Sequence, residues 1–336
     1  MVETSDNSDL RAVVLAGGDG SRLQRLTRKI DGDWRPKQFS KIFGGKSLLA
    51  HTRERLRPIC ADDQVSFVVI KDHERFYRNE LADVDASRIV AQPSNRGTGV
   101  AIIAALLQLW KSAPEAIVSF FPSDHYFADD AAFRATVQLA IEVSRMHRDC
   151  IVLVGAKPQW PEVEYGWIEP GTSMEDGPGP FLFKVNRFLE KPQLAEARRL
   201  METGGLWNTF VTIGHAKTFL KLLKDTVPYA VHEISNAFRQ GGAEIAYREL
   251  ESIDFSKHVL SQTRRQLLVI RDEVSGWADL GNPRRVIETL LGNRIVPSWL
   301  RQMLDVPRLL EEITGVRAAA QVGVATIQAE RTTAIV

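Results

Sequence analysis

Short apolar runs, separated by segments with helical periodicity, dominate the first half of the chain. Four runs are rich in β-branched and aromatic residues, as buried parallel strands tend to be, and they span 11–16, 65–70, 116–121 and 150–156. Between them, apolar residues recur at helical spacing over 102–110 and 133–141. Strands that alternate with helices indicate βαβ units, so we expect an α/β fold with a doubly wound, predominantly parallel sheet flanked by helices.

The pattern changes after residue 158. Residues 160–180 are rich in glycine, proline and aromatic residues, which is typical of loops and antiparallel strands. Further elements are expected beyond this stretch, with strands at 181–190 and 266–270 and helices at 195–202, 217–224, 229–238 and within 297–313. The second half is therefore expected to form a small, mixed α+β part.

Composition and charge narrow the function classes. The 336 residues are 44% hydrophobic, and 43 basic side chains nearly balance 42 acidic ones, which argues against a nucleic-acid binder without sequence specificity. No run reaches the ~18 apolar residues that a membrane span needs, and residues 1–9 are polar, unlike a signal peptide. We therefore expect a cytoplasmic protein with a flexible N-terminus at 1–9 and no nucleic-acid or membrane partner.

A glycine cluster follows the first predicted strand. Residues 15–23 are LAGGDGSRL, and residues 36–39 are PKQF. Glycines after a buried strand let backbone N–H groups approach a phosphate, and Arg22 and Lys37 would add cations to a triphosphate. The dinucleotide pattern GxGxxG fails at Leu23, and the P-loop pattern fails at Ser40. A glycine-rich turn without a ligand is the alternative interpretation.

Two aspartates are candidates for metal binding. Asp124 follows the predicted strand 116–121 at its C-terminal end, where open α/β sheets bind ligands. A carboxylate there can hold Mg²⁺ against phosphate oxygens, and Asp279 can supply a second carboxylate. The alternative for both is the capping of a turn or helix. The adjacent His125 is as well explained by a structural role as by a catalytic one.

Polar residues at the end of the predicted strand 181–190 suit a sugar phosphate. The carboxylate of Glu190 can accept hydrogen bonds from sugar hydroxyls, and the ammonium of Lys191 can meet the phosphate as a point charge. An exposed ion pair of little energetic weight is the alternative.

Seven motifs in this order resemble those of the sugar-nucleotide pyrophosphorylases, nucleotidyltransferases with a GT-A-like fold, and in particular the bacterial mannose-1-phosphate guanylyltransferases. The motifs are LAGGDGSRL with PKQF, then QPSNRGT at 92–98, FPSDH at 121–125, YGWI at 165–168, FLEKP at 188–192, WNT at 207–209 and GWADLG at 276–281. One such motif is weak support, but seven in order over residues 10–292 are specific.

The resemblance implies a domain organisation and a reaction. It implies one nucleotidyltransferase domain at 10–292, with a nucleotide-binding half at 10–157 and a sugar-phosphate half at 158–292. Residues 293–336 are expected to form a C-terminal helical appendage and tail. GTP and mannose-1-phosphate are the implied substrates, and Mg²⁺ is the implied cofactor. Since the family often forms dimers, a homodimer is also compatible, with contacts in 297–336.

The resemblance also assigns roles to individual residues. It gives catalysis to Arg22, Lys37 and Asp124, and metal binding to Asp124 and Asp279. The implied nucleotide-binding residues are Leu15, Ala16, Gly17, Gly18, Gly20, Gln92, Asn95, Arg96, Gly97, Thr98 and Ser123. The implied sugar-phosphate residues are Gly166, Glu190, Lys191 and Asn208.

The implied reaction is attack of the sugar phosphate on the α-phosphate of GTP. The nucleophile is already an anion, so positioning and charge neutralisation suffice. Phe210 stands where many members have glycine, and we expect it to narrow the sugar pocket. Two alternatives stay open: a related nucleotidyltransferase with another sugar or base, and a catalytically weak paralogue that binds sugar nucleotide.

Overall fold

The computed structural model describes residues 7–174, 181–240, 242–263 and 266–302. These residues form a mixed nine-stranded sheet with the order β3-β2-β1-β4-β8-β5-β9-β7-β6. The strands are β1 (Leu10–Leu15), β2 (Val65–Ile70), β3 (Ile89–Gln92), β4 (Ile117–Pro122), β5 (Ile151–Ala156), β6 (Gly166–Ser173), β7 (Leu182–Glu190), β8 (Leu206–His215) and β9 (Leu267–Asp272). Within the described part, no helix combines the length and apolar character that a membrane crossing requires.

The predicted parallel sheet is confirmed in the first half of the molecule, where β3, β2, β1 and β4 are all parallel neighbours. The second half is mixed. Strand β8 runs antiparallel between β4 and β5, β9 is parallel to β5, and β7 is antiparallel to both β9 and β6. The antiparallel β6 and β7 agree with the mixed part expected after residue 158.

Strand β8 lies in the middle of the sheet, yet its sequence did not predict a strand. Nearly all of its side chains are buried on both faces, so it lacks the alternation of a half-exposed strand. The buried polar residues Asn208, Thr209 and Thr212 also interrupt its apolar run. Of these three residues, Asn208 is a candidate site residue, and Thr209 donates a hydrogen bond from Oγ1 to the carbonyl of Val154 in β5 at 2.7 Å.

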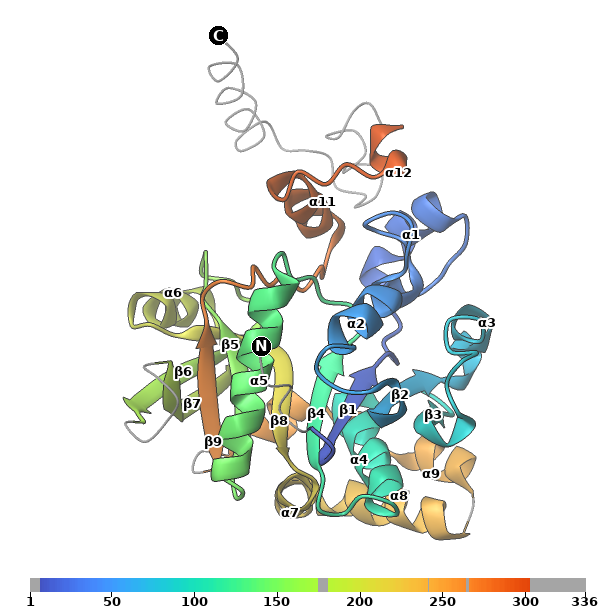
Figure 1. Ribbon diagram of the computed structural model, residues 1–336, viewed down its shortest axis with the longest axis vertical. Helices are drawn as coiled ribbons and strands as arrows, with labels where there is room; N and C mark the ends of the chain where they lie inside the picture. Colours follow the sequence, from blue (N-terminus) through green and yellow to red (C-terminus); the bar gives the residue numbers. More distant parts are fainter. Residues whose placement is uncertain (1–6, 175–180, 241, 264–265, 303–336) are drawn as a thin grey trace.

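Helices cover both faces of the sheet (Figure 1). Helices α2 (Leu48–Leu56) and α5 (Asp130–Met146) lie on one face, and α4 (Gly97–Trp110), α7 (Ala216–Thr226) and α8 (Pro228–Gln240) lie on the other. Successive residues of β1 alternate between these layers, since Val14 packs with α2 and α5 whereas Val13 packs with α4. Burial on both faces explains why the parallel strands are continuous apolar runs.

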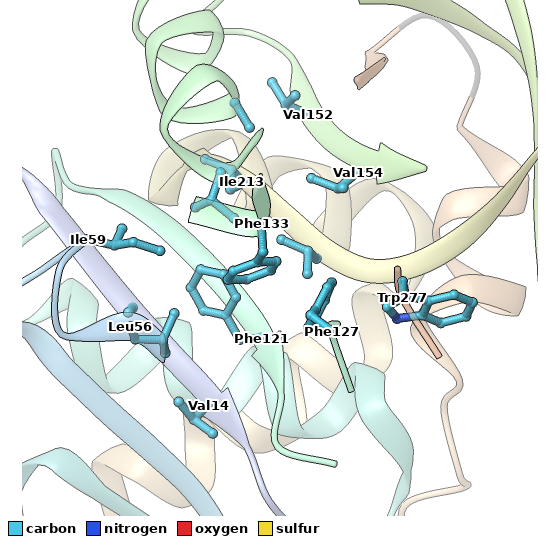
Figure 2. Close-up of a cluster of buried hydrophobic side chains, with 14 of the residues drawn as sticks. Val14, Leu56, Ile59, Phe121, Phe127, Phe133, Val152, Val154, Ile213 and Trp277 are labelled. Atoms are coloured by element: carbon cyan, nitrogen blue, oxygen red, sulfur yellow. The ribbon is translucent and has the colours of Figure 1, made fainter. Parts of the chain in front are cut away.

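Aromatic side chains fill the layer between α5 and the sheet. Figure 2 shows Phe121 of β4 beside Phe133 of α5, with Phe127 next to them and Trp277 at the edge of the cluster. The ring centroids of Phe127 and Phe133 are 4.2 Å apart, a distance typical of aromatic packing. This packing fixes the segment that follows β4, which carries Asp124.

A separate hydrophobic cluster joins the end of the described chain to its beginning. Helices α11 (Pro283–Gly292) and α12 (Ser298–Arg301) pack against α1 (Gln24–Asp31). Trp299 donates a hydrogen bond from Nε1 to the carbonyl of Ile42 at 2.8 Å. Only α12 of the helices expected within 297–313 lies in the described part, and residues 303–336 of the predicted appendage lie outside it. The remaining helices are α3 (Glu74–Tyr77), α6 (Leu194–Glu202), α9 (Ala243–Glu249) and α10 (Phe255–His258).

Candidate active site

The carboxyl ends of the parallel strands bring the nucleotide motifs together. Leu15 at the end of β1 is paired with Pro122 of β4, and Ile70 of β2 is paired with Gln92 of β3. The loops that follow these strands therefore leave the sheet at the same edge. A Cβ atom placed on Gly17 would lie 3.5 Å from Nε2 of Gln92, so the loop after β1 contacts the end of β3.

Gln38 holds the glycine loop through two hydrogen bonds. It belongs to the PKQF motif, but no role was predicted for it from the sequence. The Nε2 group of Gln38 donates to the carbonyls of Ala16 at 2.9 Å and Gly18 at 2.8 Å. The Ser123 hydroxyl donates to the carbonyl of Leu15 at 2.8 Å. Because the loop carbonyls accept hydrogen bonds from buried side chains, these bonds hold the loop backbone in place.

The PKQF segment and the QPSNRGT segment both contact this loop. Gly20 has a φ of 61°, and a Cβ atom there would lie 2.7 Å from the backbone nitrogen of Lys37, so this contact requires glycine. Asn95 donates from Nδ2 to Asp19 Oδ2 at 3.0 Å. The three motifs that the resemblance assigns to the nucleotide thus form one surface.

Lys37 lies between the two candidate metal ligands. Its Nζ is 3.2 Å from Asp124 Oδ2 and donates to the backbone carbonyl of Asp279 at 2.9 Å. Three residues from distant parts of the sequence therefore converge. Arg22 lies on the exposed side of the loop, with Nη1 3.5 Å from Oε2 of Glu164.

The carboxylate of Asp279 has a second cationic neighbour that the sequence did not reveal. Arg285 of α11 approaches Asp279 Oδ1 to 2.7 Å with Nη1, and Glu162 Oε2 to 2.5 Å with Nη2. Burial would raise the pKa of Asp279, but the charges of Arg285 and Lys37 outweigh it and the pKa lies below its ordinary value. Asp279 is therefore ionised at neutral pH.

These two aspartates fit a magnesium ion that arrives with phosphates. Among the described residues, no group of three or more His, Cys, Asp or Glu side chains is arranged to hold a metal. Mg²⁺ is usually held by one or two carboxylates together with substrate phosphates and waters. Asp124 and Asp279 provide that partial set, with side chains 22% and 16% exposed, which leaves both accessible.

The sugar-phosphate residues also converge. Gly166 of β6 is paired with Glu190 of β7, and a Cβ atom on Gly166 would lie 2.8 Å from Glu190 Oε2 and 3.3 Å from the Cβ of Asn208. Asn208 donates from Nδ2 to Ser256 Oγ at 3.4 Å. Lys191 Nζ is 3.7 Å from Glu190 Oε1. The absence of a side chain at Gly166 thus lets Glu190 and Asn208 pack closely against its backbone.

The pKa of Glu190 lies well above the ordinary value of a glutamate. Burial, with a further contribution from the negative charge of Asp254, raises the pKa of Glu190 to about 7. A group whose charge changes near neutral pH inside a cluster of polar side chains is typical of functional sites.

Arg96 is not directed toward the glycine loop. Its guanidinium donates to the carbonyl of Tyr247 and, at 3.2 Å, to that of Arg248. Thr98 Oγ1 accepts a hydrogen bond from the backbone N–H of Phe255 at 2.9 Å. Arg96, which the resemblance assigns to the nucleotide, is thus directed in the structure toward the end of α9, and Thr98 contacts the start of α10.

His125 is held in a structural setting. Its Nδ1 accepts a hydrogen bond from Trp277 Nε1 at 3.1 Å, and its Nε2 is 3.8 Å from Asp124 Oδ1. Burial lowers its pKa. A neutral imidazole between an indole and an aspartate fits the structural role that the sequence left open.

Phe210 has a left-handed backbone, with a φ of 65°. Its ring packs against Phe255 of α10 with centroids 6.2 Å apart. A positive φ favours glycine, which explains why a glycine is common at this place in the family pattern. The residue lies two positions after Asn208, whose Oδ1 accepts a hydrogen bond from the N–H of Phe210 at 3.1 Å.

Comparison with known proteins agrees with this geometry. The model of the nucleotidyl transferase family matches residues 11–292. The xanthan biosynthesis protein XanB of Xanthomonas campestris pv. campestris (strain B100) is 30% identical over 289 residues, which cover 82% of this chain and 58% of that protein. The mannose-1-phosphate guanylyltransferase of Escherichia coli (strain K12) is 29% identical over 291 residues, covering 82% of this chain and 58% of that protein.

A solved structure has a similar fold. The crystal structure described as mannose-1-phosphate geranyltransferase from Thermus thermophilus is 29% identical, has a TM-score of 0.73, and the match covers 83% of this chain and 79% of that one. The matches span 58% of the length of the curated relatives named above. The residues that the family model matches, 11–292, include the convergent residues of the candidate site. The resemblance carried by the motifs is thus confirmed: the chain belongs to the nucleotidyl transferase family.

Proposed function

We propose that the protein makes GDP-mannose and pyrophosphate from GTP and mannose-1-phosphate. A phosphate oxygen of the sugar phosphate attacks the α-phosphorus of GTP, and the bond from that phosphorus to the bridging oxygen of the β-phosphate breaks. The observation that carries the proposal is the position of Lys37, 3.2 Å from Asp124 and 2.9 Å from the carbonyl of Asp279, beside the glycine loop. The attacking oxygen is already an anion, so no general base is required.

The nucleotide side would work through fixed dipoles and cations. Backbone N–H groups of the glycine loop, held by Gln38, would meet the phosphates of GTP without reorganisation. Lys37 and Arg22 would offset the negative charge that builds on the leaving pyrophosphate. Asp124 and Asp279 would hold Mg²⁺, which when bound neutralises phosphate charge.

The sugar side would work through orientation. Glu190 and Asn208, which both lie against Gly166, would bind sugar hydroxyls, while Lys191 would meet the sugar phosphate. Holding the attacking phosphate near the α-phosphorus converts a bimolecular step into an effectively unimolecular one.

Pyrophosphate release over a grid of nucleoside triphosphates and sugar-1-phosphates tests this proposal. We expect the highest kcat/KM for GTP with mannose-1-phosphate, and no release from GTP without a sugar phosphate. Higher kcat/KM for another pair would favour the related transferase, for which the hydrogen bond from the Phe210 N–H to Asn208, at a position where many members have glycine, is the supporting observation. Binding of sugar nucleotide without release from any pair would favour a non-catalytic protein.

A further inference from the structure

The carboxylate of Asp279 is held on one of its two oxygens. Its Oδ1 accepts hydrogen bonds from the Tyr165 hydroxyl at 2.8 Å, from Arg285 Nη1 at 2.7 Å and from the N–H of Gly281 at 2.9 Å. Its Oδ2 accepts no hydrogen bond from any residue that the structure describes. Three donors occupy the lone pairs of Oδ1, so a bound cation would have to meet Oδ2.

Arg285 is itself rigidly held. Its side chain is only 8% exposed, it pairs with Glu162 at 2.5 Å, and its guanidinium lies 4.6 Å from the ring centroid of Tyr165. Glu162 in turn accepts hydrogen bonds from Trp160 Nε1 at 3.1 Å and from the N–H of Glu164 at 2.9 Å. A guanidinium fixed between two carboxylates and a ring cannot follow Asp279 if that side chain turns.

The charges in this cluster leave a net negative charge for a cation. Arg285 carries one positive charge against the two carboxylates of Glu162 and Asp279. Lys37 adds a second positive charge, paired with Asp124 and close to Asp279, so three carboxylates face two cations.

The contact between Asp279 and Arg285 requires that residue 281 has no side chain. A Cβ atom at this position would lie 2.6 Å from Asp279 Oδ2 and 2.9 Å from Arg285 Nη1. Any other residue would push one of these groups away, so a glycine is required for this geometry.

We propose that Tyr165 and Arg285 are positioning residues, which hold Asp279 so that its Oδ2 faces the divalent cation. This inference rests on the proposed function, in which Asp279 binds Mg²⁺. Groups that orient a metal ligand typically change metal affinity 10- to 100-fold when they are removed.

Binding of Mn²⁺ in the presence of GTP, followed by water-proton relaxation, tests the inference with a readout that does not itself depend on turnover. We expect Arg285→Gln and Tyr165→Phe to raise the Mn²⁺ dissociation constant about 10-fold or more, and Arg285→Lys to recover part of the loss. The KM for mannose-1-phosphate should change less than about twofold. Arg53→Gln is the matched control. The side chain of Arg53 is 16% exposed, and it pairs at a distance of 2.5 Å with Asp83, a residue that is not part of the candidate site. This substitution should alter the melting temperature but not the Mn²⁺ affinity.

Two results would overturn the inference, and they are distinguishable. Unchanged Mn²⁺ affinity in folded Tyr165→Phe and Arg285→Gln, together with weakened affinity in Asp279→Ala, rejects the positioning role alone. Unchanged affinity in Asp279→Ala rejects the metal assignment in the proposed function, and the positioning role with it.

Discussion

Glu190 is a buried carboxyl whose charge decides how it can meet a sugar. When ionised, it offers two acceptor oxygens to sugar hydroxyls, and when protonated it loses part of that capacity. Burial and the charge of Asp254 raise its pKa to about 7, so both forms are populated at neutral pH. Substrate binding should therefore depend on pH through this residue.

The KM for mannose-1-phosphate should rise as the pH falls from 8 to 6, by up to about 10-fold, because Glu190 becomes about 90% protonated one unit below its pKa. Glu190→Gln should have a higher KM at pH 8 and a flatter profile. Steady-state kinetics of both proteins across this range provide the measurement, and the variant corrects for ionisation of the substrate. Parallel pH profiles would contradict the role given to Glu190.

The same shift predicts an effect on stability. A carboxyl whose pKa is raised on folding contributes stability below its unfolded pKa, and this contribution is lost as the pH rises through about 7. At pH 8 the buried charge is therefore a cost, of about 3 kcal/mol at most. Glu190→Gln should have a higher free energy of unfolding than the wild type at pH 8, but not at pH 4, by urea denaturation. A variant that is less stable at pH 8 would show that the charge is well compensated.

At the scale of elements, the start of α4 is bound to the segment before α10. Ile253 donates its N–H to the carbonyl of Arg96 at 2.9 Å and accepts from the N–H of Gly99 at 2.7 Å. Gly97 has a φ of 84°, and a Cβ atom there would lie 2.3 Å from the carbonyl oxygen of Ile253. This contact joins the QPSNRGT segment to the residues between α9 and α10.

Gly97→Ala should cost at least about 2 kcal/mol of stability, since it combines a left-handed backbone with a clash against a main-chain atom. Gly18→Ala is the matched control, because nothing lies within 4 Å of a Cβ atom there. We expect the control to keep its stability within about 0.5 kcal/mol and to raise the KM for GTP. Equal stability of the two variants in urea would contradict the proposed docking of α4.

At the scale of the whole molecule, α12 near the end of the described chain packs in one hydrophobic cluster with the end of the glycine loop. Trp299 is 7% exposed and belongs to the same cluster as Leu23, which ends the glycine loop. The packing of this cluster should therefore affect both stability and the nucleotide side of the site.

Trp299→Ala should cost about 3–5 kcal/mol, because it removes a large buried side chain and the hydrogen bond to Ile42. It should also raise the KM for GTP. Trp34→Ala removes a tryptophan that is 48% exposed and should cost less than about 1 kcal/mol. Thermal and urea unfolding compare the two, and a stability of Trp299→Ala equal to that of Trp34→Ala would reject this role of α12.

The strands that were predicted correctly are those whose burial on both faces gives a continuous apolar run in the sequence. The strands expected at 11–16, 65–70, 116–121 and 150–156 agree with β1, β2, β4 and β5 to within one residue at each end. Strand β8 was not predicted, because polar residues interrupt its apolar run.

Site residues were predicted where they follow the end of a strand, as Asp124 does. Arg285 and Glu162 left no local signal, since they are 123 residues apart and meet only in the folded chain. The direction of the Arg96 side chain could not be predicted from the sequence either, because its carbonyl partners lie 151 and 152 residues away along the chain.

The kcat/KM for pyrophosphate release from GTP and mannose-1-phosphate, compared between the wild type and Asp124→Asn, tests the central claim most directly. The substitution keeps the shape of the side chain and removes its charge. We predict measurable release by the wild type and a loss of about 10³-fold in the variant, with an unchanged melting temperature as the control. Near-normal turnover by the folded variant, or no release by the wild type, would contradict the account.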